Sequence, residues 1–209
     1  MIEQGSPEWF AQRRGKATAS RVADIIAKTK SGYGASRANY MAELIAERLT
    51  GVSVEGYTNA AMQWGKDKEP EAIAAYEFLT NAEIERVAFV DHPDIAMSGA
   101  SPDGLVGAEG MIEAKCPNTA THLDTLLGEP IAGKYITQMQ WQMATTDRKW
   151  CDWVSFDPRL PDEMRLFVKR VFRDDVMIRD LEKEVLAFLD ELEEKVDTLR
   201  TRYMAKAAA

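Results

Sequence analysis

The sequence has few residues of the kinds that build zinc sites or Cys/His catalytic pairs. Its 209 residues include two cysteines, two histidines and no glycine-rich loop of the GxxxxGK[ST] kind. Neither a zinc site nor a Cys/His nucleophile is expected from so few of these residues. Without the phosphate loop, no nucleotide cofactor is expected either. We expect Cys116 and Cys151 to be reduced thiols.

Long apolar segments are absent too. No run approaches the roughly 20 residues that cross a bilayer, and residues 1–25 lack the basic-then-apolar order of a signal peptide. We therefore expect a cytoplasmic protein with no membrane partner. The composition, 45% hydrophobic and 29% charged, is that of a globular protein. The length predicts a single domain, 1–209.

The formal net charge of −8 is unevenly distributed. Residues 173–197 carry ten acids and four bases, whereas "QRRGKATASR" at 12–21 carries four bases and no acid. A local basic patch can attract an anion despite an acidic total. Net charge therefore does not decide whether the partner is nucleic acid, and a merely solvated basic face stays open.

The apolar periodicity predicts an α/β (mixed α+β) fold with a central mixed sheet flanked by helices. The expected strands are 83–91, 95–99, 110–116, 149–158 and 164–172. The expected helices are 18–28, with Thr18 or Ser20 as N-cap; 37–50, ending at Gly51; 59–79, kinked or restarted at Pro70; 133–146; and 174–203, an acidic amphipathic helix with Leu181, Phe188 and Leu192 inward. Residues 30–36 read as a loop.

Two charged residues stand in the apolar strand "GMIEAKCP". Glu113 and Lys115 are two apart and so face the same side of a strand, and the turn "SPDG" places Asp103 ten residues before Glu113. Burying charge without partners is costly. Two carboxylates and an ammonium are what a Mg²⁺-dependent phosphodiester hydrolase needs, with Glu69 and Glu71 as further acids nearby.

The triplet alone is weak evidence. The pattern acid-x-Lys also occurs at Asp147–Lys149 and Glu193–Lys195, in a polar turn and in the acidic helix. Only the triplet at 113–115 has apolar neighbours and a preceding aspartate turn. From spacing alone, a metal site and a structural ion pair at a sheet edge stay open equally.

The combination of motifs is more specific. "SPDG" followed by "EAKCP" resembles the lambda exonuclease, or viral alkaline exonuclease, YqaJ-type branch of the PD-(D/E)xK nuclease superfamily. "WFAQRRGKATAS", "WGKDKEPEA", "YITQMQWQM" and "FDPR" occur in the order of that family. The resemblance covers roughly residues 8–160 and implies a restriction-endonuclease-like nuclease core.

The resemblance also implies roles for individual residues. Asp103, Glu113 and the Ala114 carbonyl would bind Mg²⁺ (or Mn²⁺ as a substitute), as two ions, with Glu69 near the second. Lys115 would act on the water, and Gln138 would lie beside the site. Arg13 and Ser20 would receive a 5′-phosphate. Pro70 makes Glu69 the least certain ligand, with Asp91 or Asp94 as substitutes, and Ser101 either bonds near the site or shapes the turn.

The implied function is a Mg²⁺-dependent, ATP-independent processive 5′→3′ exonuclease on double-stranded DNA ends. It would release 5′-mononucleotides and leave a 3′ single-stranded tail for a single-strand annealing protein, in a phage or prophage context. The family also implies a homotrimeric ring. Two alternatives are an endonuclease or junction-processing enzyme, which would cut closed circular duplex, and a non-catalytic DNA-end-binding module, which would not bind Mg²⁺ or Mn²⁺.

The remaining conspicuous residues have ordinary readings. The five tryptophans are expected in the core, with Trp9 the one that could lie near DNA because it precedes the basic segment. His92, before Pro93, is expected in a surface turn, and His122 in a helix.

Overall fold

The computed structural model describes residues 2–30, 32–54 and 59–204. In chain order these residues form α1 (Pro7–Arg13), β1 (Ala17–Thr18), a 3₁₀ turn η1 (Ala19–Arg21), α2 (Val22–Ile26), β2 (Lys28–Thr29), β3 (Gly32–Tyr33), α3 (Ala35–Thr50), α4 (Ala60–Thr80), β4 (Ile84–Glu85), β5 (Val90–Asp91), β6 (Ser98–Ala100), β7 (Gly104–Val106), β8 (Gly110–Lys115), α5 (Thr119–Leu126), α6 (Gly133–Thr146), β9 (Trp150–Phe156), η2 (Asp162–Met164), β10 (Leu166–Phe172), α7 (Asp175–Leu199) and η3, a π-helical end (Arg200–Met204).

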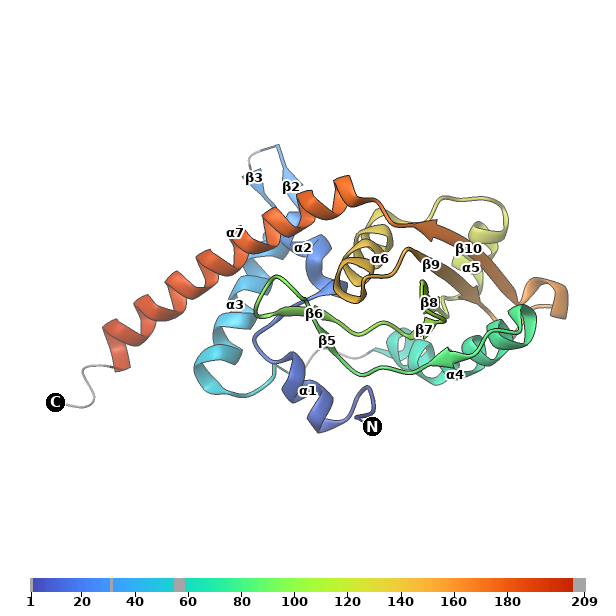
Figure 1. The fold of residues 1–209 in the computed structure, drawn as a ribbon, viewed down its shortest axis with the longest axis horizontal. Helices are drawn as coiled ribbons and strands as arrows, with labels where there is room; N and C mark the ends of the chain where they lie inside the picture. The colour runs from blue at the N-terminus through green and yellow to red at the C-terminus, as the bar shows by residue number, and fades with distance from the viewer. Residues whose placement is uncertain (1, 31, 55–58, 205–209) are drawn as a thin grey trace.

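The main sheet is mixed, as predicted. Its strand order is β10-β9-β8-β7-β4, with β8 and β9 parallel and the other pairs antiparallel. A second sheet, β1-β6-β5, joins the basic segment to the strand before the SPDG turn. In Figure 1 the main sheet occupies one half of the molecule, and α7 runs diagonally across the other half toward the C-terminus. The predicted fold class, helices around a mixed sheet, is confirmed.

The two faces of the main sheet have different cores. Ala72, Ile73 and Tyr76 of α4 pack with Ile112 and other β8 and β9 residues. Met139 and Met143 of α6 pack with Met111, Cys151 and Trp153. Since side chains alternate along a strand, the odd-numbered residues of β8 face α6. This alternation directs Glu113 and Lys115 toward α6 and leaves Ile112 and Ala114 to α4.

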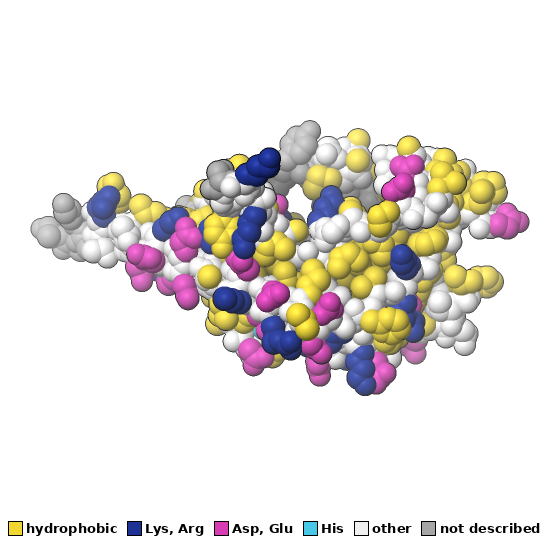
Figure 2. Space-filling view, turned by 90° about the horizontal axis from the view of Figure 1, so that it is seen from above, with side chains coloured by type: hydrophobic (Ala, Val, Ile, Leu, Met, Phe, Trp, Pro, Cys, Tyr) yellow, Lys and Arg dark blue, Asp and Glu magenta, His cyan; other side chains and the backbone are white. Residues whose placement is uncertain are grey.

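The long C-terminal helix closes a third core over α2, α3 and α6. Leu181, Phe188 and Leu192 are buried as predicted, and each such side chain contributes roughly 1.5–3 kcal/mol on burial. Acidic and basic side chains both stand along the projecting end of the molecule in Figure 2. The predicted amphipathic helix is therefore confirmed, with Asp174 as its N-cap.

Several local predictions were wrong. The first helix is Pro7–Arg13, capped by Ser6, and α2 starts only at Val22. Thr18 makes no side-chain capping bond, and Ser20 lies exposed within η1. Lys28–Thr29 and Gly32–Tyr33 pair as a short hairpin where a loop was expected. The expected strand 83–91 is two short strands in different sheets.

The α4 helix runs continuously through Pro70. The sequence predicted a kink or a restart there, because proline removes one helical N–H.

Two other helices begin or end at residues typical of helix caps. Asn118 accepts the N–H of Thr121 at the start of α5, and Gly51 ends α3 at a positive φ of 67°.

Candidate active site

The SPDG turn lies against the end of β8. Gly104 of β7 pairs with Ile112 of β8, so Asp103, one residue before β7, falls beside Glu113 and Ala114. Asp103 Oδ2 accepts the backbone N–H of Ala114 at 2.7 Å. This bond fixes the aspartate to the strand that carries the glutamate and the lysine.

Glu113 has three side-chain donors. Lys115 Nζ contacts Glu113 Oε1, Gln138 Nε2 donates to the same oxygen at 2.7 Å, and Gln142 Nε2 donates to Oε2 at 2.7 Å. Both glutamines come from α6, which covers this face of the sheet. The structure thus brings together four residues that the sequence named, Asp103, Glu113, Lys115 and Gln138, and adds Gln142.

The pKa values of the cluster are shifted because its carboxylates are buried close to one another. Burial, and then the charges of Glu113 and Glu69, raise the pKa of Asp103 well above its usual value. Burial likewise raises the pKa of Glu69, although Arg86 and Lys115 oppose that shift. Burial alone would lower the pKa of Lys115, but the charges of Glu113 and Asp103 outweigh it and raise the pKa.

Glu69 is one step removed from the cluster. Arg86 Nη1 lies 3.5 Å from Glu69 Oε1 and donates to the Asp103 carbonyl at 3.0 Å, so the arginine links α4 to the SPDG turn. A cavity of about 700 Å³ opens beside them, between α4 and the N-terminal segment. Its lining includes Trp9, Phe10, Lys66, Glu69 and Arg86.

The basic segment reaches the same region from the other side. Arg13 Nη1 donates to Ser101 Oγ at 3.0 Å, and Trp9 Nε1 donates to the same oxygen at 3.0 Å. The Arg13 guanidinium lies over the Trp9 ring, 4.2 Å from its centroid. Burial lowers the pKa of Arg13, partly offset by Tyr40 and Glu47. Ser20, the other residue assigned to the phosphate, is exposed on η1 and forms no hydrogen bond with Arg13 in the part of the chain that the structure describes.

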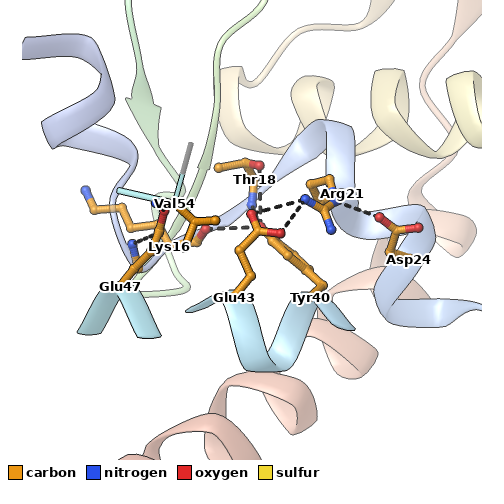
Figure 3. A network of polar contacts seen from close by, with 9 residues as sticks. Lys16, Thr18, Arg21, Asp24, Tyr40, Glu43, Glu47 and Val54 are labelled. Atoms are coloured by element: carbon orange, nitrogen blue, oxygen red, sulfur yellow. Dashed lines mark hydrogen bonds and ion pairs between the residues drawn. The ribbon is translucent and has the colours of Figure 1, made fainter. Parts of the chain in front are cut away.

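Side chains of α3 hold the backbone of residues 15–18 (Figure 3). Glu47 accepts the N–H groups of Gly15 and Val54, at 2.7 and 2.9 Å. Tyr40 Oη accepts the N–H of Thr18 and donates to the Lys16 carbonyl. With backbone groups of Gly15, Lys16 and Thr18 hydrogen-bonded to α3, the chain that follows Arg13 is held in one conformation.

The other bases of the segment are also paired. Arg14 donates to Ser53, Lys16 pairs with Asp91, and Arg21 pairs with Asp24 and Glu43. The reading of 12–21 as a merely solvated face is thus not supported. Asp91, a substitute ligand in the sequence reading, is exposed and occupied by Lys16.

The tryptophans and His92 differ in part from expectation. Trp141 and Trp153 are buried, whereas the other three are half-buried. Each of those three has an arginine over its ring: Arg13 on Trp9, Arg159 on Trp64 and Arg170 on Trp150.

His92 is buried, and its Nδ1 accepts the N–H groups of Asp94 and Ile95. The surface-turn assignment was wrong because the imidazole closes this turn from inside.

Gln142 was missed by the sequence reading. It stands four residues after Gln138, and residues four apart share one face of a helix. The spacing Q-x-x-x-Q on a helix that packs against the "EAK" strand was the available signal. Both cysteines are free thiols, as expected, and both are buried.

The residues present fit a hard divalent cation. Mg²⁺ typically takes one or two carboxylates together with carbonyl oxygen and water, and Asp103, Glu113 and the Ala114 carbonyl supply those oxygens. In the described part of the chain, no three His, Cys, Asp or Glu side chains converge into a complete metal site. The donor set therefore suits a partly hydrated Mg²⁺ and not a closed zinc site.

The fold is one that exonucleases of known structure share, as comparisons with known proteins show. Residues 8–149 match the YqaJ-like viral recombinase domain, and the chain belongs to that family. It is 52% identical to the alkaline exonuclease LHK-Exo from Laribacter hongkongensis, with a TM-score of 0.89 over 98% of this chain and 100% of that one. A structure of LHK-Exo in complex with dAMP matches equally.

A more distant structure shares the fold alone. The phage related exonuclease from Haemophilus somnus 129PT is 16% identical, with a TM-score of 0.67 over 88% of this chain and 96% of that one. No curated protein matches the sequence. No helix among the described residues is long and apolar enough to cross a membrane.

Proposed function

We propose that the chain is a Mg²⁺-dependent, ATP-independent deoxyribonuclease that degrades one strand of double-stranded DNA from its 5′ end. It releases 5′-mononucleotides and leaves a 3′ single-stranded tail. One observation carries the proposal: Asp103 is held on the Ala114 N–H next to Glu113, which Lys115 and Gln138 contact. Arg86 joins this turn to the wall of the cavity that Glu69 also lines. The 52% identity to an exonuclease supports the same reaction class.

The proposed Mg²⁺ ligands are Asp103, Glu113 and the Ala114 carbonyl for one ion, and Glu69 for a second. Bound there, the ions (or Mn²⁺ in their place) would supply Lewis-acid polarisation of the phosphate and lower the pKa of a water. The chain's own residues do the positioning. Lys115 orients the attacking water and stabilises charge that develops on the phosphate, and Gln138 holds the Glu113 oxygen nearest Lys115.

The strand end is placed by Arg13. A terminal phosphate carries more charge than an internal diester, and a guanidinium binds it through charge-assisted hydrogen bonds. Arg13 already donates to Ser101, two residues from Asp103, so a 5′-phosphate bound there lies close to the carboxylates. Ser101 is the hydroxyl proposed to complete this pocket, and the role of Ser20, which is exposed on η1, stays a prediction from the family resemblance.

The proposed partners follow from the product. A 3′ tail is the substrate of a single-strand annealing protein, and a homotrimeric ring around the DNA would give processivity without ATP. The family name, a viral recombinase domain, supports this context, in a phage or prophage within a bacterial host.

The test uses linear duplex labelled at the 5′ or the 3′ end, with Mg²⁺ or with a chelator. We expect label at the 5′ end to be released first as mononucleotide, and only with Mg²⁺. Closed circular duplex should resist cleavage, and its cutting would favour an endonuclease. Binding of DNA ends without Mn²⁺ or Mg²⁺ binding would favour a non-catalytic module.

A further inference from the structure

Gln142 lies inside the protein, where its amide meets the carboxylate at the centre of the proposed site. Its side chain is fully buried on α6, and Nε2 donates to Glu113 Oε2 at 2.7 Å. We propose that Gln142 is a positioning residue that fixes Glu113 in the orientation needed to bind the metal ion. This inference rests on the proposed function.

The geometry separates the two glutamines of α6. Gln138 holds Oε1 and Gln142 holds Oε2, so the pair fixes both ends of the carboxylate. One donor would leave the group free to turn about its terminal bond, whereas two donors from a rigid helix define its plane. Gln138 and Gln142 are four residues apart and so project from the same face of α6.

The three contacts still leave Glu113 able to bind a ligand. A carboxylate offers about four lone-pair positions, of which Lys115 and Gln138 use those of Oε1 and Gln142 uses one of Oε2. One position on Oε2 therefore remains. Because Gln142 occupies the other position, it decides the direction in which the free one points.

The stability of the fold alone does not explain why a glutamine side-chain amide is buried at position 142. Gln142 Oε1 is buried and has no hydrogen-bond partner among the described residues, and an unpartnered buried acceptor is destabilising. Its helix neighbours Met139 and Met143 show that an apolar side chain suits this core. What glutamine adds over methionine is the donor to Glu113.

Gln140 provides a matched control. It is on the same helix and buried, but its amide donates to the Phe172 carbonyl and accepts the N–H of Asp174. It therefore ties α6 to the end of β10 and to the start of α7. Gln140→Met therefore makes the same substitution on the same helix, but it removes hydrogen bonds to the backbone and none to Glu113.

The experiment measures Mn²⁺ affinity by calorimetry without DNA, and urea unfolding without metal, for wild type, Gln142→Met and Gln140→Met. We expect Gln142→Met to weaken Mn²⁺ binding on the order of 10-fold, with a smaller fall in its urea midpoint than Gln140→Met shows. We expect Gln140→Met to lower the urea midpoint with Mn²⁺ affinity unchanged. If Gln142→Met does not fold, Gln142→Leu replaces it.

Two results would overturn the inference: wild-type Mn²⁺ affinity in Gln142→Met, or the same loss of affinity in Gln140→Met. Asp103→Ala, run alongside, separates these results from failure of the proposed function. If wild type itself binds no Mn²⁺, or if Asp103→Ala binds as wild type does, the metal site is wrong and not only the role of Gln142.

Discussion

At the scale of single residues, the structure shows which groups surround the Glu113–Lys115 pair. Glu113 and Lys115 do form an ion pair, yet the pair does not stand alone at a sheet edge. Asp103 and two glutamines converge on it. A structural salt bridge needs no second carboxylate beside it, since like charges so close are destabilising.

Comparing Asp103→Ala with Lys115→Ala should distinguish a residue that binds the metal ion from one that acts only on the reaction. Asp103→Ala removes a hard oxygen ligand and should abolish both Mn²⁺ binding and hydrolysis. Lys115→Ala should retain Mn²⁺ binding while turnover falls by about 10²–10⁴-fold, as expected for loss of a group that assists proton transfer. Calorimetry and the rate of mononucleotide release, measured on the same samples, check this. Equal loss of binding and rate in Lys115→Ala would reduce the lysine to a counter-ion of Glu113.

Arg13→Ala should remove the advantage of phosphorylated ends. The guanidinium beside Ser101 is proposed to bind the 5′-phosphate, so its loss should slow a 5′-phosphate duplex toward the rate of a 5′-hydroxyl duplex. Initial rates on the matched duplexes, for wild type and variant, test the pocket. Mn²⁺ affinity is the control and should not change. A phosphate preference that survives in the variant would point to Arg14, Lys16 or Arg21 instead.

At the scale of elements, α3 acts as a brace for the basic segment. Glu47 and Tyr40 hydrogen-bond to backbone groups of residues 15–18 and 54, so we assign them the role of holding the chain in place. In the turn after β9, which carries the motif "FDPR", Asp157 accepts hydrogen bonds from the side chain and the backbone N–H of Arg159.

Glu47→Gln should loosen the segment that follows Arg13. The oxygen of a glutamine amide can accept one of the two backbone N–H groups that Glu47 accepts. The amide nitrogen then lies opposite the other N–H, and two donors cannot form a hydrogen bond with each other. We expect a raised KM on 5′-phosphate duplex with little change in kcat, plus a loss of about 1–3 kcal/mol in the free energy of unfolding. Glu43→Gln, on the same helix but paired with Arg21, is the control and should leave KM unchanged. Unaltered KM in Glu47→Gln would make its role one of stability only.

Asp157 gives a prediction in acid. Burial alone would raise its pKa, but hydrogen bonds from Arg159 and Thr119 outweigh burial and lower it to about 2. A lowered pKa stabilises the fold above the ordinary aspartate value of about 4, and this stability is lost as pH falls toward 2. Asp157→Asn should therefore cost about 1–2 kcal/mol at pH 7, a discounted value because Arg159 is 45% exposed.

Urea unfolding across pH 7 to 3 checks that expectation. The difference between wild type and Asp157→Asn should be constant down to about pH 5 and should shrink below about pH 4. A difference that does not change with pH would mean that the turn depends on hydrogen bonding and not on the charge of Asp157.

At the scale of the whole molecule, charge is sorted between surfaces. The apolar side of α7 packs on α2 and α3, and three of its acids, Glu184, Glu191 and Glu193, pair with Lys28, Arg37 and Arg48. The basic segment lies beside the proposed site. DNA phosphate is thereby attracted to one region and repelled from another, which reconciles a net charge of −8 with a nucleic-acid substrate.

The proposed ring predicts the mass in solution. Light scattering should report about three times the chain mass of 23.4 kDa, and degradation of long duplex should proceed without dissociation in the presence of competitor DNA. A monomer at micromolar concentration that is nevertheless processive would remove the topological explanation and leave the chemistry intact.

The sequence by itself determined the features that depend on near neighbours in the chain. The alternation in "GMIEAKCP" placed Glu113 and Lys115 on one face, the 3.6-residue period defined α6 and the inward side of α7, and Gly51 ended α3. These follow from local backbone geometry. The helix 7–13 and the β2–β3 hairpin were not predicted, because segments this short show little hydrophobic periodicity. Their conformation depends on the residues against which they pack.

Only the tertiary structure decided which distant residues meet. Arg13 bonds Ser101 across 88 positions, Gln142 reaches Glu113 across 29, and Arg86 comes between Glu69 and Asp103. Such contacts depend on strand register and on which helix covers which face, and no spacing along the chain encodes them. Ser20 shows the converse: close in sequence to Arg13, it is turned to solvent because Tyr40 and Glu47 bind the intervening backbone to α3.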